Sequence, residues 1–512
     1  MSALTEVIVV GGGPTGLLLA AELRLAGADP LVLEAADGAL RRTRSLGLRG
    51  LNGRTVQSLR LRGLTDRLAA AQAELFDLLA SGGEADGEDP TRDLVRLLSA
   101  NRAKGHFGGL PLIEDAADPG GPPTQFVLQQ HVLERLLADR LAELGVRIRA
   151  GCPVVDVQPE DTGVRAVLAD GSSVRAAYLV GCDGGRSTVR KRAGIAFPGT
   201  DATMTGRTAV AQLADPGAIT AALHGPRGLL SLSMVPGEIA TIEFDGGPAD
   251  RDEPVTAEEM AASISRVSGT EVTITELAAA IRYSDNTRQA ETYRRGRVLL
   301  AGDAAHVHSP IGGQGLNLGL QDALNLGWKL GLVVRGLAPE SLLDSYTAER
   351  HPVGERVLRN TRAQVALLRP GAQVAALREV LRETLTIPAA KRHFIEMANG
   401  LDIDYAPGSA HPLVGRFAPP LELTGADPLP VLLGGGRAVL LDLVDRKEIR
   451  DIGAGHADRV RVVGAACPSH PELTAVLLRP DGYVAWATSD AELTGLPEAL
   501  DSWFGPALML SP

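Results

Sequence analysis

Short apolar runs and longer stretches of helical spacing alternate along the chain. The short runs are bounded by glycine or charged residues and predict buried strands at residues 6–10, 31–33, 174–180 and 298–301. Apolar residues at helical spacing predict helices at residues 17–26, 55–64, 131–144 and 316–335. This alternation favours an α/β fold built on a largely parallel sheet.

Other regions break this alternation. Residues 200–285 contain short β-like runs between Gly/Pro turns and predict an antiparallel layer inserted into the α/β part. Residues 342–401 are mostly helical in pattern, and the Pro- and Gly-rich residues 405–437 read as a linker to a small α/β module at 438–512. Residues 80–124 show little periodicity, so we expect a long excursion there.

Composition and charge argue against several classes of partner and site. The net charge of -11 argues against nucleic acid as a partner, and no apolar run is long enough to predict a membrane helix. The three cysteines are widely spaced without a C-x-x-C pair, which argues against a structural zinc site and a dithiol redox centre. With no signal-peptide pattern at the start, we expect a cytoplasmic protein without a metal.

A glycine-rich turn follows the first predicted strand. Gly11, Gly13 and Gly16 form G-x-G-x-x-G between a strand and a helix. Gly11 allows the tight turn, Gly13 lets the backbone approach a pyrophosphate, Gly16 lets the helix meet the strand, and Pro14 suits a first helical turn. Glu34 ends the next strand and is placed to bind a ribose without a 2′-phosphate, which favours FAD or NAD here.

A second ligand signal lies near the middle of the chain. Gly302 and Asp303 follow the predicted strand at 298–301, where parallel sheets bind ligands, so Asp303 is a candidate acceptor for a polyol hydroxyl. Gly313 and Gly315 belong to a loop that opens the helix predicted from Leu316. The positive end of that helix would stabilise the negative edge of a reduced flavin. The alternative is a structural turn and a helix whose glycine seam serves packing.

A third strand–turn–helix pattern surrounds Asp183 and Gly184. Arg186 and Arg190 stand one helical turn apart and either face an anionic group or lie solvated on a surface turn. A further arginine cluster forms a solvated face or supplies one or two cofactor contacts; it comprises Arg41, Arg42, Arg44, Arg49 and Arg54.

Taken together, these three patches resemble the three fingerprints of single-component, class A FAD-dependent aromatic hydroxylases of the p-hydroxybenzoate hydroxylase type. Residues 105–111, 178–190 and 478–482 resemble bacterial hydroxylases of aromatic polyketides, particularly those of angucycline and tetracycline pathways. The resemblance implies a Rossmann-like FAD-binding domain, an inserted antiparallel β substrate domain and a C-terminal thioredoxin-like domain without redox cysteines. The expected division is 1–180 and 286–404 for the FAD-binding domain, 181–285 for the substrate domain and 405–512 for the C-terminal domain.

The resemblance also implies a set of cofactor-binding residues. Thr15 and Glu34 would hold the ADP half of FAD, Val154 would lie by the adenine, and Asp303 would bind the ribityl chain. Leu316 and Asn317 would bind the flavin pyrimidine edge through their backbone. The full set is Gly11, Gly13, Pro14, Thr15, Gly16, Glu34, Ala35, Arg44, Gln130, Val154, Asp183, Gly302, Asp303, Pro310, Gly313, Gly315, Leu316 and Asn317.

The reaction implied is cofactor chemistry. NADPH, bound transiently, reduces FAD; dioxygen then forms a flavin hydroperoxide that hydroxylates a polycyclic aromatic polyketide intermediate in antibiotic-type metabolism. No side chain is assigned as catalytic, although Pro310 flanks the proposed oxygen site. An antibiotic-inactivating or Baeyer–Villiger enzyme of the same fold, and more remotely a non-catalytic flavin-binding protein, remain alternatives. The sequence leaves open NADPH against NADH, the carbon oxidised, and a monomer against a homodimer.

Overall fold

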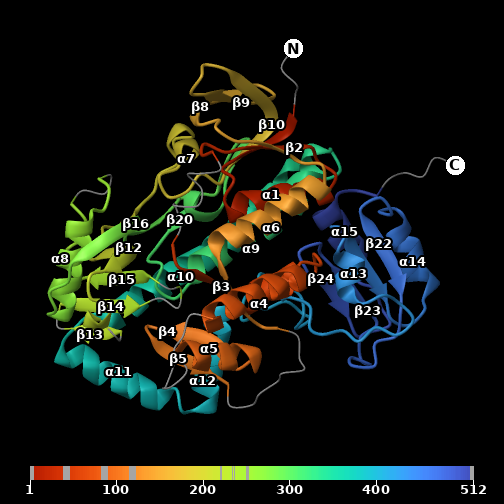
Figure 1. Ribbon diagram of the computed structural model, residues 1–512. Helices are drawn as coiled ribbons and strands as arrows, with labels where there is room; N and C mark the ends of the chain where they lie inside the picture. Colours follow the sequence, from red (N-terminus) through yellow and green to blue (C-terminus); the bar gives the residue numbers. More distant parts are fainter. Residues whose placement is uncertain are drawn as a thin grey trace.

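The computed structural model describes residues 5–37, 46–81, 90–114, 123–219, 222–225, 227–232, 235, 237–249 and 253–507. Its central sheet has the strand order β18-β19-β10-β1-β2-β7, and the β8-β9 pair extends it from β10 (Figure 1). The strands are β1 Thr5–Val10, β2 Pro30–Leu33, β7 Arg147–Arg149, β8 Val154–Glu160, β9 Gly163–Leu168, β10 Ser173–Gly181, β18 Arg294–Arg295 and β19 Val298–Leu300.

Five of these strands run parallel as neighbours. β1 pairs in parallel with β2 and β10, β10 with β19, and β2 with β7. Their carboxyl ends therefore lie at one edge of the sheet and deliver Gly11, Glu34, Asp183 and Gly302 to it. The predicted α/β class is confirmed, and the Asp170–Gly171 turn connects β9 to β10 as an antiparallel pair.

Two helices beside this sheet, α1 and α9, pack against each other through a seam of glycines on α9. On α9, a Cβ added at Gly327 would lie 2.3 Å from the Cβ of Glu22, and one added at Gly331 would lie 2.4 Å from the Cβ of Ala26, both on or at the end of α1. The seam thus serves close helix packing. The helices of this part are α1 Pro14–Leu25, α3 Gly53–Arg60, α4 Thr65–Ser81, α6 Gln130–Glu143, α7 Thr188–Arg192, α9 Gln314–Val334 and α10 Asp344–Leu368, with 3-10 turns η2 Gly302–Ala304 and η3 Glu340–Leu343.

The inserted layer is a five-stranded antiparallel sheet in the order β13-β14-β15-β12-β16, as the sequence predicts. One face packs on helix α8 through apolar side chains such as Ala209, Ile239 and Ile264. The elements are β11 Gly199–Thr200, β12 Thr205–Leu213, η1 Pro216–Ala218, β13 Leu223–Gly225, β14 Gly228–Leu232, β15 Glu238–Glu243, α8 Ala257–Ser268, β16 Ile274–Ser284, β17 Thr287–Gln289 and β20 His306–Val307.

The expectation of a long excursion at residues 80–124 is wrong for the residues described there. They form helix α5 and the β4-β5 hairpin, which is held by distant contacts: Phe107 stacks edge-on against Phe394 at 4.9 Å between ring centroids. The elements of this hairpin, of the β3-β6 pair and of the helices nearby are β3 Leu48–Leu51, α5 Pro90–Ser99, β4 Ala103–Phe107, β5 Leu110–Ile113, β6 Phe126–Gln129, α11 Ala372–Thr384 and α12 Pro388–Asn399.

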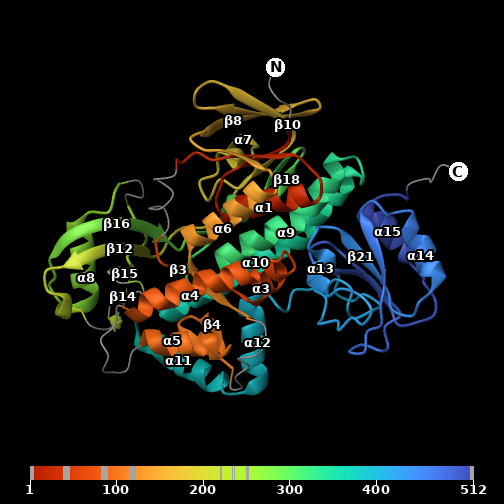
Figure 2. The ribbon, with the colours of Figure 1, turned by 45° about the vertical axis from the view of Figure 1, so that its right-hand side comes forward.

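The C-terminal module has a four-stranded sheet in the order β22-β21-β23-β24. It lies on the opposite side of the parallel sheet and its helices from the inserted layer in both views (Figures 1 and 2). The linker predicted at 405–437 is largely irregular and joins the module through isolated bridges such as Phe417 with Tyr483. The module contains α13 Leu429–Leu433, β21 Ala438–Asp442, α14 Lys447–Ala454, β22 Val460–Gly464, β23 Ala475–Leu478, β24 Val484–Thr488 and α15 Leu496–Phe504.

Candidate active site and cofactor cavity

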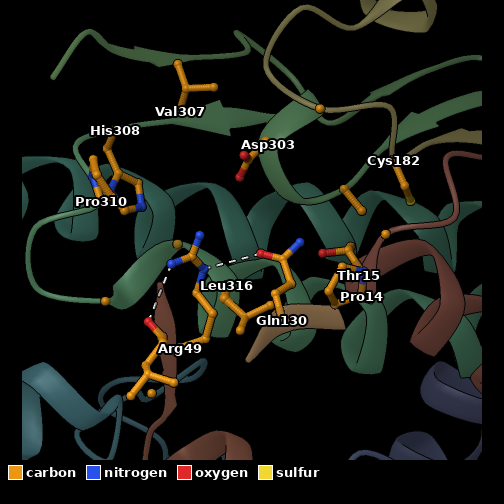
Figure 3. Close-up of a pocket in the computed structure, with 17 residues that line it drawn as sticks. Pro14, Thr15, Arg49, Gln130, Cys182, Asp303, Val307, His308, Pro310 and Leu316 are labelled. Atoms are coloured by element: carbon orange, nitrogen blue, oxygen red, sulfur yellow. Dashed lines mark hydrogen bonds between the residues drawn. The ribbon is translucent and has the colours of Figure 1, made fainter. Parts of the chain in front are cut away.

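A cavity of about 400 Å³ opens at the carboxyl edge of the parallel strands. Figure 3 shows the side chains that surround it, from elements far apart in the sequence. They include Thr15 at the start of α1, Arg49 on β3, Gln130 on α6, Asp303 after β19 and Leu316 on α9. Many of the residues that the sequence nominates for FAD therefore line one space.

The glycine-rich turn has two glycines fixed by packing and one that faces open space. Gly11 has φ +108°, and an added Cβ would lie 2.2 Å from the carbonyl oxygen of Cys182. A Cβ at Gly16 would lie 2.0 Å from the carbonyl oxygen of Gly11. A Cβ at Gly13 would meet no atom within 4 Å, so the structure leaves room beside Gly13 for a ligand. Gly13 and Pro14 also open α1, whose first N–H groups are suited to a phosphate.

Glu34 is buried and fixes the glycine turn. Its carboxylate accepts hydrogen bonds from the backbone N–H of Gly12 at 2.6 Å and of Ala36 at 2.7 Å. Ala35, between these contacts, is exposed. Val154, expected near the adenine, lies at the start of β8, two residues after Cys152, whose N–H donates to the carbonyl of Glu34. Glu34, Ala35 and Val154 do not line the cavity, and their contacts with an adenosine stay predictions.

Asp303 supplies the acidic side chain of the cavity wall. It lies in the 3-10 turn after β19, and its carboxylate faces the space shown in Figure 3. Burial of the surroundings raises the pKa of Asp303, while the positive fields of His306 and Arg49 oppose that rise. The preceding Gly302 has φ +62°, and a Cβ there would lie 2.9 Å from the Oγ1 of Thr15, so this turn closes directly against the start of α1.

A buried cluster of charged side chains contacts the Gly302–Ala304 turn on the side away from the cavity. The Asp322 carboxylate, 0% exposed, accepts from the N–H of Gly302 at 3.1 Å and from the guanidinium Nε of Arg350 at 2.8 Å, and it is 2.7 Å from Nε2 of His306. Burial alone would raise the pKa of Asp322, but the charges of Arg350 and His306 outweigh it and hold that pKa below its ordinary value. His306 is therefore a structural partner and not a free acid–base group. No motif or spacing in the sequence points to Asp322.

The loop before α9 forms another wall. Gly313 has φ +62° and caps the helix, which begins at Gln314, two residues before the predicted start. Pro310, Gly313, Gly315 and Leu316 line the cavity, so the first turn of α9 faces it. The side chain of Asn317 instead ties α9 to β3, since it accepts from the N–H of Asn52 and donates to the carbonyl of Gly50.

His308 lies beside this loop and lines the cavity. Its ring is 2.8 Å from the carbonyl of Ser309 through Nδ1, which must therefore carry the proton. Burial lowers the pKa of His308 to about 4, so the ring is neutral near pH 7. Ser309 is buried, and its hydroxyl accepts from the N–H of Ile311.

Of the predicted arginine cluster, Arg49 is the member found in the cavity. Its Nε donates to the side-chain oxygen of Gln130 at 3.3 Å, the contact drawn in Figure 3. Burial lowers the pKa of Arg49, against the fields of Glu238, Tyr283 and Asp303. Arg54 contacts the C-terminal part instead, with its guanidinium 4.2 Å from the Phe417 ring centroid. Arg44 lies outside the described residues, as do Arg41 and Arg42.

The turn after β10 is built mainly by internal contacts. The Asp183 carboxylate accepts from the hydroxyl of Ser187 at 2.5 Å and from the N–H of Val189 at 3.1 Å, which fixes the start of α7. The interpretation of Arg190 as a ligand for an anion, or as a solvated surface residue, is wrong. Arg190 is buried, donates to the carbonyls of Ala304 and Gly185, and stacks 3.6 Å from the Phe197 ring centroid.

Cysteine and metal chemistry find no support in the residues that the structure describes. Cys152, Cys182 and Cys467 are free thiols, and burial raises the pKa of Cys182, which makes its thiol a poor nucleophile. Over the same residues, no group of three or more His, Cys, Asp or Glu side chains could hold a metal ion. No helix there is long and apolar enough to cross a membrane.

Comparison with known proteins matches both parts of the chain. A family model described as FAD binding domain matches residues 4–361, and one described as aromatic-ring hydroxylase, C-terminal, matches residues 411–507. A 12-dehydrotetracycline 5-monooxygenase/anhydrotetracycline 6-monooxygenase of Streptomyces rimosus is 39% identical, over 98% of this chain and 99% of its own.

Two further matches differ in the activity that their names give. The crystal structure of CabE, an aromatic hydroxylase from angucycline biosynthesis, is 38% identical with a TM-score of 0.84, over 99% of this chain and 100% of its own. A dialkyldecalin synthase of Streptomyces rugosporus is 38% identical, over 98% of this chain and 99% of its own. Sequence similarity at this level therefore includes a relative whose name is not that of an oxygenase.

Proposed function

Because this chain belongs to the family of FAD-dependent aromatic-ring hydroxylases, we propose that it hydroxylates a polycyclic aromatic polyketide, with FAD, NADPH and dioxygen as co-reactants. The flavin-dependent monooxygenase class follows from the family. The polycyclic substrate, the transient binding of NADPH and the residue roles are proposals. We also propose the domain limits 1–180 and 286–404, 181–285, and 405–512.

One observation carries the cofactor placement. The open space at Gly13, the cavity-facing carboxylate of Asp303 and the first turn of α9 surround the same cavity. These groups suit three successive parts of FAD. The N–H groups of α1 suit its pyrophosphate, Asp303 suits its ribityl hydroxyls, and the backbone at Leu316 and Asn317 suits its pyrimidine edge. Bound FAD, once reduced by NADPH, would supply the oxygen-activating chemistry.

The protein's own contribution is to orient the substrate and exclude water. Positive potential at the start of α9 stabilises negative charge on the flavin side of the cavity. Pro310 and Gly313 form a rigid wall that carries no titratable side chain, next to a neutral His308. A polycyclic ring held against this wall would displace water from the reacting carbon.

The inserted sheet supplies the proposed substrate surface. Val210, Ala240 and Ile242 alternate with the side chains that pack on α8 and so lie on the opposite face of the sheet. Glu238 lies on that same face, and its carboxylate accepts from the N–H of Gly47, directly before the cavity-lining strand β3. The aliphatic side chains of this face favour large planar ring systems by area burial at about 25 cal/mol per Å² and discriminate weakly between them.

The test compares substrates of different size. Purified protein with FAD is given NADPH and either a tetracyclic polyketide phenol or p-hydroxybenzoate, and NADPH oxidation is followed together with product mass. We expect the tetracycle to accelerate NADPH oxidation and to gain one oxygen atom. Hydroxylation of the single ring alone would overturn the substrate proposal. A converted product that has gained no oxygen would overturn the proposed hydroxylation.

A further inference from the structure

Buried charged side chains connect the C-terminal module to the turn that carries Asp303. Asp322 and Arg350 are 0% exposed, Arg479 is 2% exposed and Glu349 is 8% exposed. Burying a charge is costly unless it is paired and hydrogen-bonded, so a row of four such groups across a domain contact calls for an explanation beyond simple adhesion.

The row begins at the cofactor turn. The Asp322 carboxylate accepts the N–H of Gly302, the residue before Asp303, at 3.1 Å. The same carboxylate is 2.7 Å from Nε2 of His306, which follows the turn. Asp322 thus holds the turn on both sides of Asp303, although it does not itself line the cavity.

Two consecutive residues of α10 continue the row. Arg350 donates to Asp322 at 2.8 Å and to the hydroxyl of Tyr405 at 3.0 Å. Glu349 accepts two hydrogen bonds from Arg479, at 2.6 and 3.0 Å. Tyr405 and Arg479 both belong to the C-terminal part, which therefore contacts α10 at Arg350, the residue bonded to Asp322, and at its neighbour Glu349.

Arg479 is itself fixed on the module side. It donates from Nε to Asp481 at 3.0 Å and from Nη2 at 2.5 Å, within the tight turn that joins β23 to β24. Glu349 is also bound by Lys329 of α9 at 2.8 Å. Every charged member of the row is therefore paired, and displacement of one strains its neighbours.

We propose that the C-terminal module positions the cofactor turn through this row, with Asp322 as the positioning residue for Asp303. The proposal rests on the proposed function only in taking Asp303 to contact FAD. It gives this module, in which Cys467 is the lone cysteine, a role in holding the cofactor site that needs no thiol chemistry.

The chain offers a matched control at the same domain contact. Arg62 donates two hydrogen bonds to Glu22, both at 2.6 Å, and a third to the carbonyl of Pro480 at 2.8 Å. Arg62 and Arg479 are thus both buried, both doubly bonded to a glutamate, and both attached to the same turn of the module. Of these two arginines, only Arg479 bonds to α10, at Glu349, the residue next to Arg350.

The experiment measures FAD dissociation constants and melting temperatures of the full-length apo proteins, with the visible circular dichroism of bound flavin as a report of its orientation. Asp322→Asn should weaken FAD binding about tenfold and change the flavin spectrum, because it loses a charge-assisted hold on the turn. Arg479→Lys should weaken FAD binding severalfold and change the spectrum in the same sense. Arg62→Lys should lower the melting temperature comparably while leaving FAD affinity and spectrum at wild-type values.

The double variant Asp322→Asn/Arg479→Lys should bind FAD about as weakly as Asp322→Asn alone, since both act through one row. Unchanged FAD affinity in Asp322→Asn, or equal weakening by Arg479→Lys and Arg62→Lys, would overturn the proposal. A wild-type protein that binds no FAD would refute the proposed function itself, and that result is distinguishable because binding is measured without turnover.

Discussion

Replacing Asp303 by alanine should weaken FAD binding without destabilising the apo protein. Among the described residues, no hydrogen bond joins the Asp303 carboxylate to another side chain, and the carboxylate faces the cavity. Burial raises its pKa, so holding it ionised costs the folded apo protein stability. That cost is present above the folded-state pKa and disappears as the pH falls below the unfolded value.

The size of the loss follows from the bond removed. A hydrogen bond to a charged group contributes about 1.5–3 kcal/mol, which corresponds to about a tenfold to a hundredfold rise in the FAD dissociation constant. At saturating FAD, the same difference should appear as a smaller ligand-induced gain in the free energy of unfolding. Asp303→Asn, which keeps an acceptor oxygen but no charge, should fall between wild type and Asp303→Ala.

The assay is a titration of apo protein with FAD, followed by flavin fluorescence, beside thermal melts with and without FAD. Asp303→Ala should melt at or above the wild-type temperature as apo protein and below it when FAD is present. Unchanged FAD affinity in the folded variant would refute the contact. A large loss of apo stability would refute the reasoning that the side chain serves only the cavity.

Three further predictions address the cavity wall and the C-terminal module. Gly13→Ala should fold as wild type yet bind FAD about tenfold or more weakly, because its Cβ enters the open space proposed for the ligand. Gly16→Ala should instead lose apo stability, because its Cβ would lie 2.0 Å from a backbone oxygen. Thermal melts and FAD titrations distinguish the two variants, and equal behaviour of both would contradict the assignment. The free energy of unfolding of the wild-type apo protein should fall by up to about 3 kcal/mol between pH 6.5 and pH 4, because the unfolded chain protonates His308 at a higher pH than the folded chain, in which the pKa of His308 is about 4. His308→Gln should remove this part of the pH dependence in urea titrations, and an unchanged pH dependence would count against the prediction. Cys467→Ser should keep turnover, because Cys467 is a buried free thiol, and lost turnover with retained FAD would argue for thiol chemistry.

Local patterns predicted the cofactor half of the fold well. The glycine turn at residues 11–16 and the turn at Gly302 depend on neighbours within one strand–turn–helix unit, so their spacing carries the information. Apolar spacing predicts the start of the helix after the second turn two residues too late, because that start depends on the left-handed conformation of Gly313. End positions of helices are set by such backbone details and not by apolar spacing.

Contacts between segments far apart in the chain could not be predicted from the sequence. The β4-β5 hairpin is held by Phe394 and by Gln364, whose side chain accepts from the N–H of Gly108, more than 250 positions away. Arg49 and Arg190 look alike in sequence, yet one reaches the cavity and the other stacks on Phe197. Periodicity cannot separate them, because each fate depends on which remote segment packs beside the arginine.

The proposed reaction is oxygen transfer to a polycyclic phenol from a flavin held in the cavity at Gly13 and Asp303. The direct measurement is product mass after turnover with NADPH and ¹⁸O₂, using the FAD-loaded protein and a tetracyclic polyketide phenol. We expect one ¹⁸O atom in the product, and loss of this incorporation at low FAD in Asp303→Ala with recovery at high FAD. A product that carries oxygen from water, or no oxygen gain while NADPH is consumed equally with and without substrate, would contradict it.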